Sequence, residues 1–232
     1  MKRGNGKLLA VIALVMVLGA AVGVWLVVRG DRAVESRPLP IGVEVRVRPA
    51  GDLDHELGRV ADRVRHLTIR HADGVLVART APALVQAPRG RAQTCVLEVD
   101  PREGRRFGHD PSATGLLGVD APSGAEVVLN RALDSRLGSR DDEVTVAIAD
   151  RRQRFGVVQV VPPAGLARYC GAIVPPGTIA SMVAHSADSE AVGLVWVSFA
   201  EDATGDDIDA AVVAIRKEVG GANVEVSRFR DS

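Results

Sequence analysis

Aromatic residues and cysteine are scarce in this chain of 232 residues. Phe, Trp and Tyr together make up 3% of it, and it contains two cysteines. With so few rings, the core must be built from Val, Leu, Ile and Ala. The hydrophobic fraction of 47% is typical of a globular protein and not of a disordered one.

The sequence also lacks the motifs of common catalytic sites. It contains no GxxxxGKS or GxxxxGKT phosphate loop, no GxSxG nucleophile elbow, no HExxH zinc motif and no CxxC pair. Any nucleotide hydrolysis must therefore come from another chain. We predict that the protein is not an enzyme, with no catalytic, metal-binding or cofactor-binding residue; an anchored hydrolase has only scattered Ser, His and Asp in its support.

Two patterns resemble sites but have simpler interpretations. His55 and His66 lie on one face of a predicted helix, but about 16 Å apart along its axis, which is too far to share a metal. The paired carboxylates Asp141–Asp142 and Asp206–Asp207 fall at a turn or a helix start, where exposed N–H groups favour acids. We expect all of these side chains to be solvated.

Charge argues against nucleic acid as a partner. Beyond residue 34 the chain carries 24 Lys and Arg against 28 Asp and Glu, whereas a nucleic-acid-binding domain is expected to be basic. Arginine-rich runs occur at 102–106 and 151–154. They could contact anionic headgroups or a partner, but as hairpin-loop charges near acids they are more often simply solvated.

Residues 8–28 form an uncharged apolar run bounded by Lys7 and Arg29. At about 1.5 Å per residue such a run spans a hydrocarbon core of about 30 Å. The alternative is a cleaved secretory signal, since small residues stand at 19–21, but the apolar run continues beyond them. We predict a single transmembrane helix in the cell membrane. Lys and Arg are equally numerous on the two sides of this run, so their count does not decide the orientation of the helix. A short basic N-terminus followed by a long domain favours a cytoplasmic N-terminus and an extracytoplasmic C-terminal domain.

The pattern of the remaining chain predicts two β-α-β units, separated by a middle stretch with a different pattern. After a linker at 29–41, a strand at 42–47, a helix from Asp52 and a strand at 74–80 follow one another. A strand at 192–199, a helix opened by Thr204 and Asp207, and a last strand at 224–226 repeat that order. Such units can pack as one sheet with both helices on one face.

The middle of the chain changes to short strands broken by turns. We expect strands at 95–99, 126–129, 143–149, 154–161 and 170–174, with only two short helices, at 130–137 and 178–185. The predicted class is therefore α+β. Its parts are a cytoplasmic tip and transmembrane helix (1–28), a split β-α-β subdomain of ferredoxin-like, porter type (42–88 and 188–232) and an inserted β-rich subdomain (89–187).

The motifs of this middle stretch are more specific. EVVLNRALDSRLG (126–138), EVTVAIADRRQRFGVVQVV (143–161) and GAIVPPGTIASMV (171–183) follow one another closely, and VLEVDPREGRRF (96–107) leads a strand into an Asp-Pro turn. This order resembles the periplasmic core domain of FtsX/MacB-type ABC transporter permeases. The resemblance covers the anchor and most of residues 40–232.

The resemblance implies a first transmembrane helix that leads into an extracytoplasmic domain acting in export or transmembrane signal relay. It also implies the membrane, other membrane helices and a separate ATPase subunit as partners. The family's permeases have three further transmembrane helices after this domain, and no later apolar run here has spanning length. We therefore expect a truncated or split permease component, or alternatively a free-standing anchored binding or envelope-assembly module that shares the fold.

Two further expectations concern particular residues. Cys95 and Cys170 are each placed at the start of a predicted strand in an oxidising setting, so a disulfide is possible, with two buried free thiols as the alternative. Gly19, Ala20 and Gly23 lie on one side of the apolar helix, where small residues permit close packing. That side is a possible docking face for a copy of the helix or for other permease helices, although glycine is common in membrane helices in any case.

Overall fold

The computed structural model describes residues 39, 41–48, 52–110, 114–116, 118–138, 142–183 and 190–229. The predicted helix at 8–28 and its Gly19, Ala20 and Gly23 lie outside these residues. In the described part of the chain no helix is both long and apolar enough to cross a membrane.

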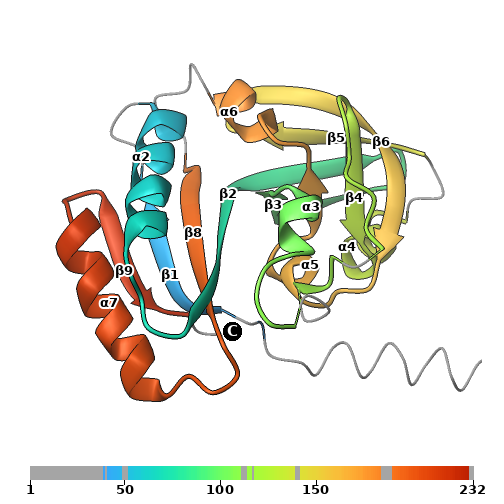
Figure 1. The fold of residues 1–232 in the computed structure, drawn as a ribbon. Helices are drawn as coiled ribbons and strands as arrows, with labels where there is room; N and C mark the ends of the chain where they lie inside the picture. The colour runs from blue at the N-terminus through green and yellow to red at the C-terminus, as the bar shows by residue number, and fades with distance from the viewer. Residues whose placement is uncertain are drawn as a thin grey trace, which may run out of the picture. The chain divides into compact units, whose positions relative to one another are not determined.

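A mixed sheet of 9 strands organises the described residues, so the α+β class is confirmed (Figure 1). The strands are β1 (Ile41–Val47), β2 (Ala72–Ala87), β3 (Gly90–Glu98), β4 (Glu126–Asn130), β5 (Glu143–Ile148), β6 (Arg151–Val161), β7 (Ala172–Val174), β8 (Val192–Phe199) and β9 (Val224–Arg228). The helices are α2 (Leu53–His66), α3 (Pro101–Gly104), α4 (Arg131–Leu137), α5 (Leu166–Tyr169), α6 (Thr178–Val183) and α7 (Gly205–Val219).

The first part of the sheet, which we call the open half, has the order β2-β8-β1-β9 with every pair antiparallel. Helices α2 and α7 contact each other and cover one face of it. Alternation in β1 turns Val43, Val45 and Val47 toward these helices, where they join one hydrophobic cluster with Leu57 of α2 and Ile215 of α7. The two β-α-β segments of the sequence thus share one sheet.

Both long helices begin as their sequences predict. The Asp52 carboxylate accepts hydrogen bonds from the backbone N–H groups of Asp54 and His55. At α7, Thr204 and Asp207 form a reciprocal capping box. Each cap satisfies amide groups that have no partner inside the helix, which fixes where the helix starts.

The second part of the sheet, which we call the barrel, is closed. Strand β2 pairs with β3 on one side and with β5 on the other, and the order β3-β7-β4-β6-β5 completes the ring. The pairs β3–β7 and β4–β6 are parallel. Its core holds Val85, Val96, Leu129, Val146 and Phe155, one from each of several strands. Closure gives each of these strands a partner on both sides, although β3 pairs with β7 only at residues 96–98.

Strand β2 belongs to both parts. Its residues 72–80 pair with β8 of the open half, and residues 79–87 pair with β3 of the barrel. The expected strand at 74–80 is therefore only the first half of an element of 16 residues. The division into 42–88 with 188–232 and 89–187 stays a prediction, and the shared strand crosses its first boundary region.

Several local expectations are wrong. Helices α3 and α5 interrupt the middle in addition to the two short helices expected. The Asp100-Pro101 pair, expected as a turn, starts α3, because the Asp100 side chain caps it and proline is tolerated in the first helical turn. Arg152 and Arg154 stand within β6, and not in a hairpin loop.

Candidate functional site

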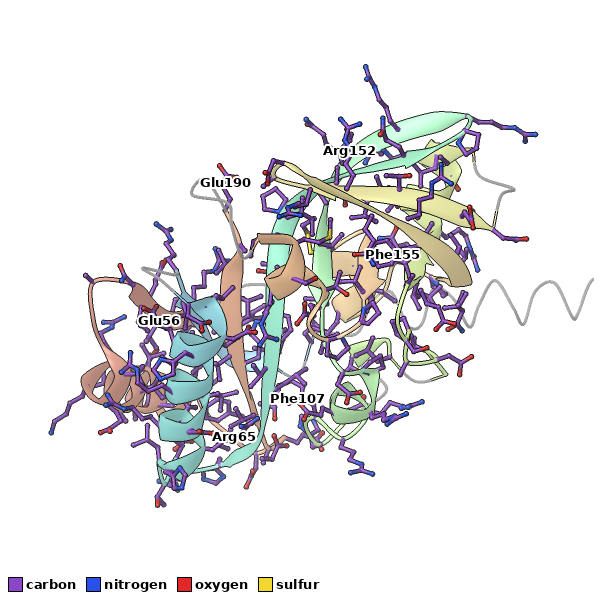
Figure 2. The ribbon with its side chains drawn as sticks, turned by 90° about the horizontal axis from the view of Figure 1, so that it is seen from above. Glu56, Arg65, Phe107, Arg152, Phe155 and Glu190 are labelled. Atoms are coloured by element: carbon purple, nitrogen blue, oxygen red, sulfur yellow. A yellow bond between two sulfur atoms is a disulfide. The ribbon has the colours of Figure 1, made fainter. Side chains whose placement is uncertain are left out.

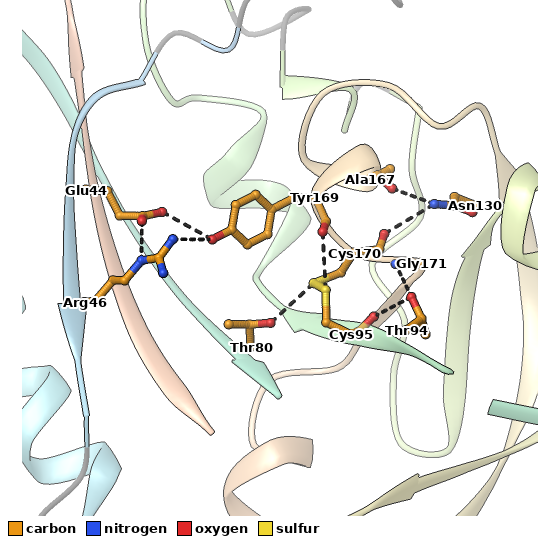
Figure 3. The surroundings of a disulfide bond; sticks show 10 residues. All are labelled: Glu44, Arg46, Thr80, Thr94, Cys95, Asn130, Ala167, Tyr169, Cys170 and Gly171. Carbon is orange, nitrogen blue, oxygen red and sulfur yellow. Dashed lines mark hydrogen bonds and ion pairs between the residues drawn. A yellow bond between two sulfur atoms is a disulfide. The ribbon is translucent and has the colours of Figure 1, made fainter. Parts of the chain in front are cut away.

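The strongest cluster of polar and aromatic side chains lies beside a disulfide bond (Figure 3). The structure joins Cys95 to Cys170 across 75 residues of sequence. Cys95 is in the interior of β3 and not at its start, because β3 begins at Gly90 in the hairpin with β2. Cys170 follows α5 directly and precedes β7, which begins at Ala172.

The side chain of Asn130 holds the segment that carries Cys170. Its Oδ1 accepts from the backbone N–H of Leu133 at 2.7 Å and so caps α4. Its Nδ2 donates to the carbonyl of Ala167 at 2.9 Å and lies 3.4 Å from that of Cys170. One buried amide thus connects the start of α4 to the end of α5.

Helix α5 reaches this position because a glycine precedes it. Gly165 has φ +55, and a Cβ there would stand 2.3 Å from the backbone of Thr114. Only a residue without a side chain permits this conformation and this approach. The end of α5 then brings the Tyr169 ring to Trp196 of β8, edge to face, with centroids 5.6 Å apart.

Glu44 of β1 is the acidic centre of the cluster. Alternation turns it to the side of the sheet opposite the valine face, and its side chain is 5% exposed. Its carboxylate accepts hydrogen bonds from Trp196 Nε1 at 2.8 Å and from Arg46 Nε at 2.5 Å, and the Tyr169 hydroxyl lies 3.4 Å away. A buried charge held this way is paired and hydrogen-bonded, as burial requires.

These contacts alter two pKa values. Burial of the phenol raises the pKa of Tyr169, and the neighbouring Glu44 charge raises it further. The hydrogen bond to Glu44 raises the pKa of Arg46. Tyr169 therefore stays a neutral hydroxyl and Arg46 a cation at any physiological pH, so neither group is tuned to exchange protons.

A cleft of about 770 Å³ opens over this cluster. Its walls come from β1, α5, α7 and β9, and its charged side chains are Glu44, Arg46, Arg168, Arg216, Glu225 and Arg228. Tyr169, Phe229 and Leu39 add apolar surface. Among the described lining residues there is no His and no Cys. With four arginines against two glutamates in its lining, the arrangement suits binding of a partially apolar, anionic segment.

A second buried polar group ties the two parts of the sheet together. Glu98 of β3 has a side chain 1% exposed and pairs with Arg79 of β2 at 2.8 Å. The other carboxylate oxygen of Glu98 accepts from the backbone N–H of Ile179 in α6 at 2.7 Å. Arg79 also pairs with Asp54 of α2 at 2.7 Å. One arginine thereby connects a helix of the open half to a strand of the barrel.

Ser198, Asp73 and His109 come together but do not form a catalytic triad. The Ser198 hydroxyl is fully buried and donates to the Asp73 carboxylate and not to an imidazole. His109 Nδ1 contacts the carbonyl oxygen of Phe199 at 2.9 Å. In a Ser-His-Asp triad the serine hydroxyl is hydrogen-bonded to the imidazole, and here the aspartate occupies that position.

The remaining sequence-based candidates are dispersed. His55 and His66 are exposed on α2. No group of His, Cys, Asp or Glu in the described residues could hold a metal. Asp207 caps α7, and the hydrogen bonds from Thr204 lower its pKa. Asp141 lies outside the described residues.

Sequence reasoning missed Glu44, Arg46, Tyr169, Trp196 and Asn130. The only signal was a carboxylate at a polar position of an alternating strand, and such a position usually faces solvent. Burial of Glu44 depends on α5, which approaches from far along the chain.

Comparison with known proteins gives structural neighbours only. No family model and no curated protein sequence matches this chain. The periplasmic region of MacB from Actinobacillus actinomycetemcomitans is 12% identical with a TM-score of 0.45, over 82% of this chain and 90% of that chain. The extracellular domain of the noncanonic ABC-type transporter YknZ from Gram-positive bacteria is 10% identical with a TM-score of 0.43, over 81% of this chain and 99% of that chain.

Proposed function

We propose that this chain is a non-catalytic, membrane-anchored extracytoplasmic domain of an FtsX/MacB-like ABC transporter permease, a truncated or split component that relays movement in export or signalling. The order of motifs at 96–107, 126–138, 143–161 and 171–183 supports the family. The apolar run at 8–28 supports the anchor, and the ATPase is a separate subunit.

The observation that carries the relay is the continuity of the sheet. Strand β2 is part of the open half and of the barrel, with no loop between them. At that junction Arg79 pairs with Asp54 on one side and with the buried Glu98 on the other. Close-packed protein interiors transmit strain, so we expect a displacement at the barrel to move the open half as well.

A second function, an anchored binding or envelope-assembly module, is favoured by the cleft beside Glu44. That cleft has charged and aromatic walls, and its described lining includes no His and no Cys. The two functions differ in their partners: a relay requires an ATPase and further membrane helices, whereas a module requires neither.

Copurification tests the proposal. The full chain, tagged and extracted in mild detergent from its own membrane, is expected to bring down an ATP-hydrolysing subunit and a protein with several membrane helices. Recovery of an envelope protein alone, lost on Ser227→Trp but retained with Val213→Trp, would establish the binding module instead. Ser227 lines the cleft, while Val213 is 65% exposed on α7, so the second variant is a matched control.

Thiol labelling tests the location. Val213→Cys is expected to react with a membrane-impermeant maleimide in intact cells if the domain is extracytoplasmic. Ala211→Cys, two residues away and 2% exposed, is expected to react only after denaturation. Labelling of Val213→Cys only after lysis would contradict the proposed location.

A further inference from the structure

The outer wall of the barrel carries arginines that have no acidic partner. Register places Gln93, Leu84, Ala147 and Arg152 in one row across β3, β2, β5 and β6. The next row is Arg91, Gln86, Thr145 and Arg154. All of these side chains are exposed or half-buried, while alternate positions such as Val85, Ala92 and Val146 are in the barrel core. We call these two rows the arginine face.

The charges of the arginine face are uncompensated. Among the described residues, no ion pair or side-chain hydrogen bond involves Arg91, Arg152 or Arg154. The nearest acids by register are Glu143, which is opposite Gly156, and Asp150 in the β5–β6 turn. Figure 2 shows Arg152 projecting from the barrel among other nitrogen-tipped side chains. A concentration of positive charge stands out because the domain as a whole is acidic.

The spacing of the arginines selects the kind of ligand. Arg91 and Arg154 are at opposite ends of one row, three strand spacings or about 14 Å apart. A single phosphate or carboxylate cannot bridge that distance, so the face requires several separate anionic groups. The positions between them in the two rows, Leu84, Gln86, Thr145 and Ala147, are uncharged, and the acid on the same face, Glu143, lies one row further along β5.

We infer that the arginine face docks the barrel against anionic lipid headgroups of the membrane that holds the chain. This inference rests on the proposed anchor. Between the apolar run and the buried Leu39 the chain has ten residues (29–38), which reach at most about 35 Å, so the domain stays near the bilayer surface. Tethering raises the effective concentration of the surface to the millimolar range, where contacts with a few arginines suffice.

Energy transfer in nanodiscs tests the docking. The full chain is reconstituted through its anchor with a donor dye on Val158→Cys and acceptor-labelled lipid in the bilayer. Val158 is 44% exposed on β6, on the side of the strand that carries Arg152 and Arg154. Transfer is expected to rise when anionic lipid replaces neutral lipid and to fall with added salt. A donor on Val213→Cys of α7 is expected to respond less.

Charge variants make the test specific. The triple variant Arg91→Gln, Arg152→Gln and Arg154→Gln is expected to lower the docked-to-free ratio by roughly 100-fold, since each basic residue near the surface contributes about a fivefold factor. The matched control neutralises the exposed residues Arg59, Arg102 and Arg106, with the same change in net charge. It is expected to retain docking.

The outcomes separate this inference from the proposed function. Equal transfer on neutral and anionic discs, or equal loss in both triple variants, overturns the docking. Loss of a copurified acidic protein with no change in transfer assigns the arginine face to a protein partner and also overturns it. If the chain does not insert at all, the proposed anchor is wrong. Docking is then tested by sedimentation with anionic vesicles, and equal binding of the two triple variants overturns it.

Discussion

The open half and the barrel are built from the same kinds of residue but are held together differently. In the open half, each helix connects strands of one β-α-β unit, and its apolar stripe packs on the sheet that those strands form. In the barrel, strands far apart in sequence close a ring, and buried polar side chains such as Asn130 and Glu98 hold short helices against it. Local pattern therefore accounts for the first part, and long-range closure for the second.

The largest expected effect comes from the junction of the two parts. Arg79→Met leaves the buried Glu98 carboxylate without its cation, which destabilises folding by about 3 to 5 kcal/mol. Because β2 is shared, we expect both parts to unfold in one transition in urea, followed by tryptophan fluorescence and circular dichroism.

Asp54→Asn is the control for this variant. It removes the other partner of Arg79. The Asp54 side chain is 47% exposed, so the loss in free energy of unfolding should stay below about 1 kcal/mol. Equal losses in the two variants would contradict a special role for the buried pair.

Removal of the disulfide is expected to weaken the barrel more than the open half. The bond closes a loop across 75 residues, which corresponds to about 4.5 kcal/mol at most in the loop-entropy description. Hydrogen exchange in β3 and β7 should accelerate more than in β1 and β9 in the Cys95→Ala, Cys170→Ala double variant. Non-reducing mass spectrometry that finds both thiols alkylatable in the native protein would show that no bond exists to remove.

Substitution of one helix-capping residue in each part compares the two parts directly. Asn130→Ala removes the cap of α4 and leaves the buried carbonyl of Ala167 without its donor, so we expect a loss of about 2 to 3 kcal/mol. Thr204→Ala removes an exposed cap of α7 and should lower the free energy of unfolding by about 1 kcal/mol. Urea unfolding at neutral pH measures both, and similar losses would mean that α5 is not held by Asn130.

The smallest expected effect is a pH dependence of the free energy of unfolding, to which one carboxylate in each part contributes. Hydrogen bonds from Ser123 lower the pKa of Glu126 at the start of β4, and those from Thr204 lower the pKa of Asp207. Each ionised form is therefore favoured by folding. Its stabilisation is present above the ordinary pKa values of 4.5 and 3.8 and is lost as the pH falls through the lower, folded values.

Variants that remove the hydroxyl donors test this directly. In carboxyl NMR titrations, Ser123→Ala should raise the pKa of Glu126 alone, and Thr204→Ala that of Asp207 alone. For Glu126 the backbone N–H of Ser123 is the larger cause and stays in the variant, so that shift is expected to be reduced and not abolished. A titration curve that does not move in its own variant would rule out a contribution from the hydroxyl.

Much of the open half could be predicted from sequence, because its information is local. Period-two alternation in β1 and β8, the stripe of α2 and the Thr204–Asp207 capping box each depend on residues a few positions apart. Strands β4 to β7 could also be predicted, with ends shifted by a few residues, but the barrel half of β2 and the first half of β3 were missed. What periodicity does not contain is the identity of the pairing partner, since alternation only says which residues share a face.

The sequence by itself determined the β-α-β order, the helix starts, the valine-rich core positions and the apolar run at 8–28. Only the tertiary structure decided that β2 belongs to both the open half and the barrel, that Glu44 is buried under Tyr169 and Trp196, and that Arg91 and Arg154 share one exposed row. The physical reason is chain closure: these neighbours meet only after segments far apart in sequence have been brought together, and no local preference encodes that meeting.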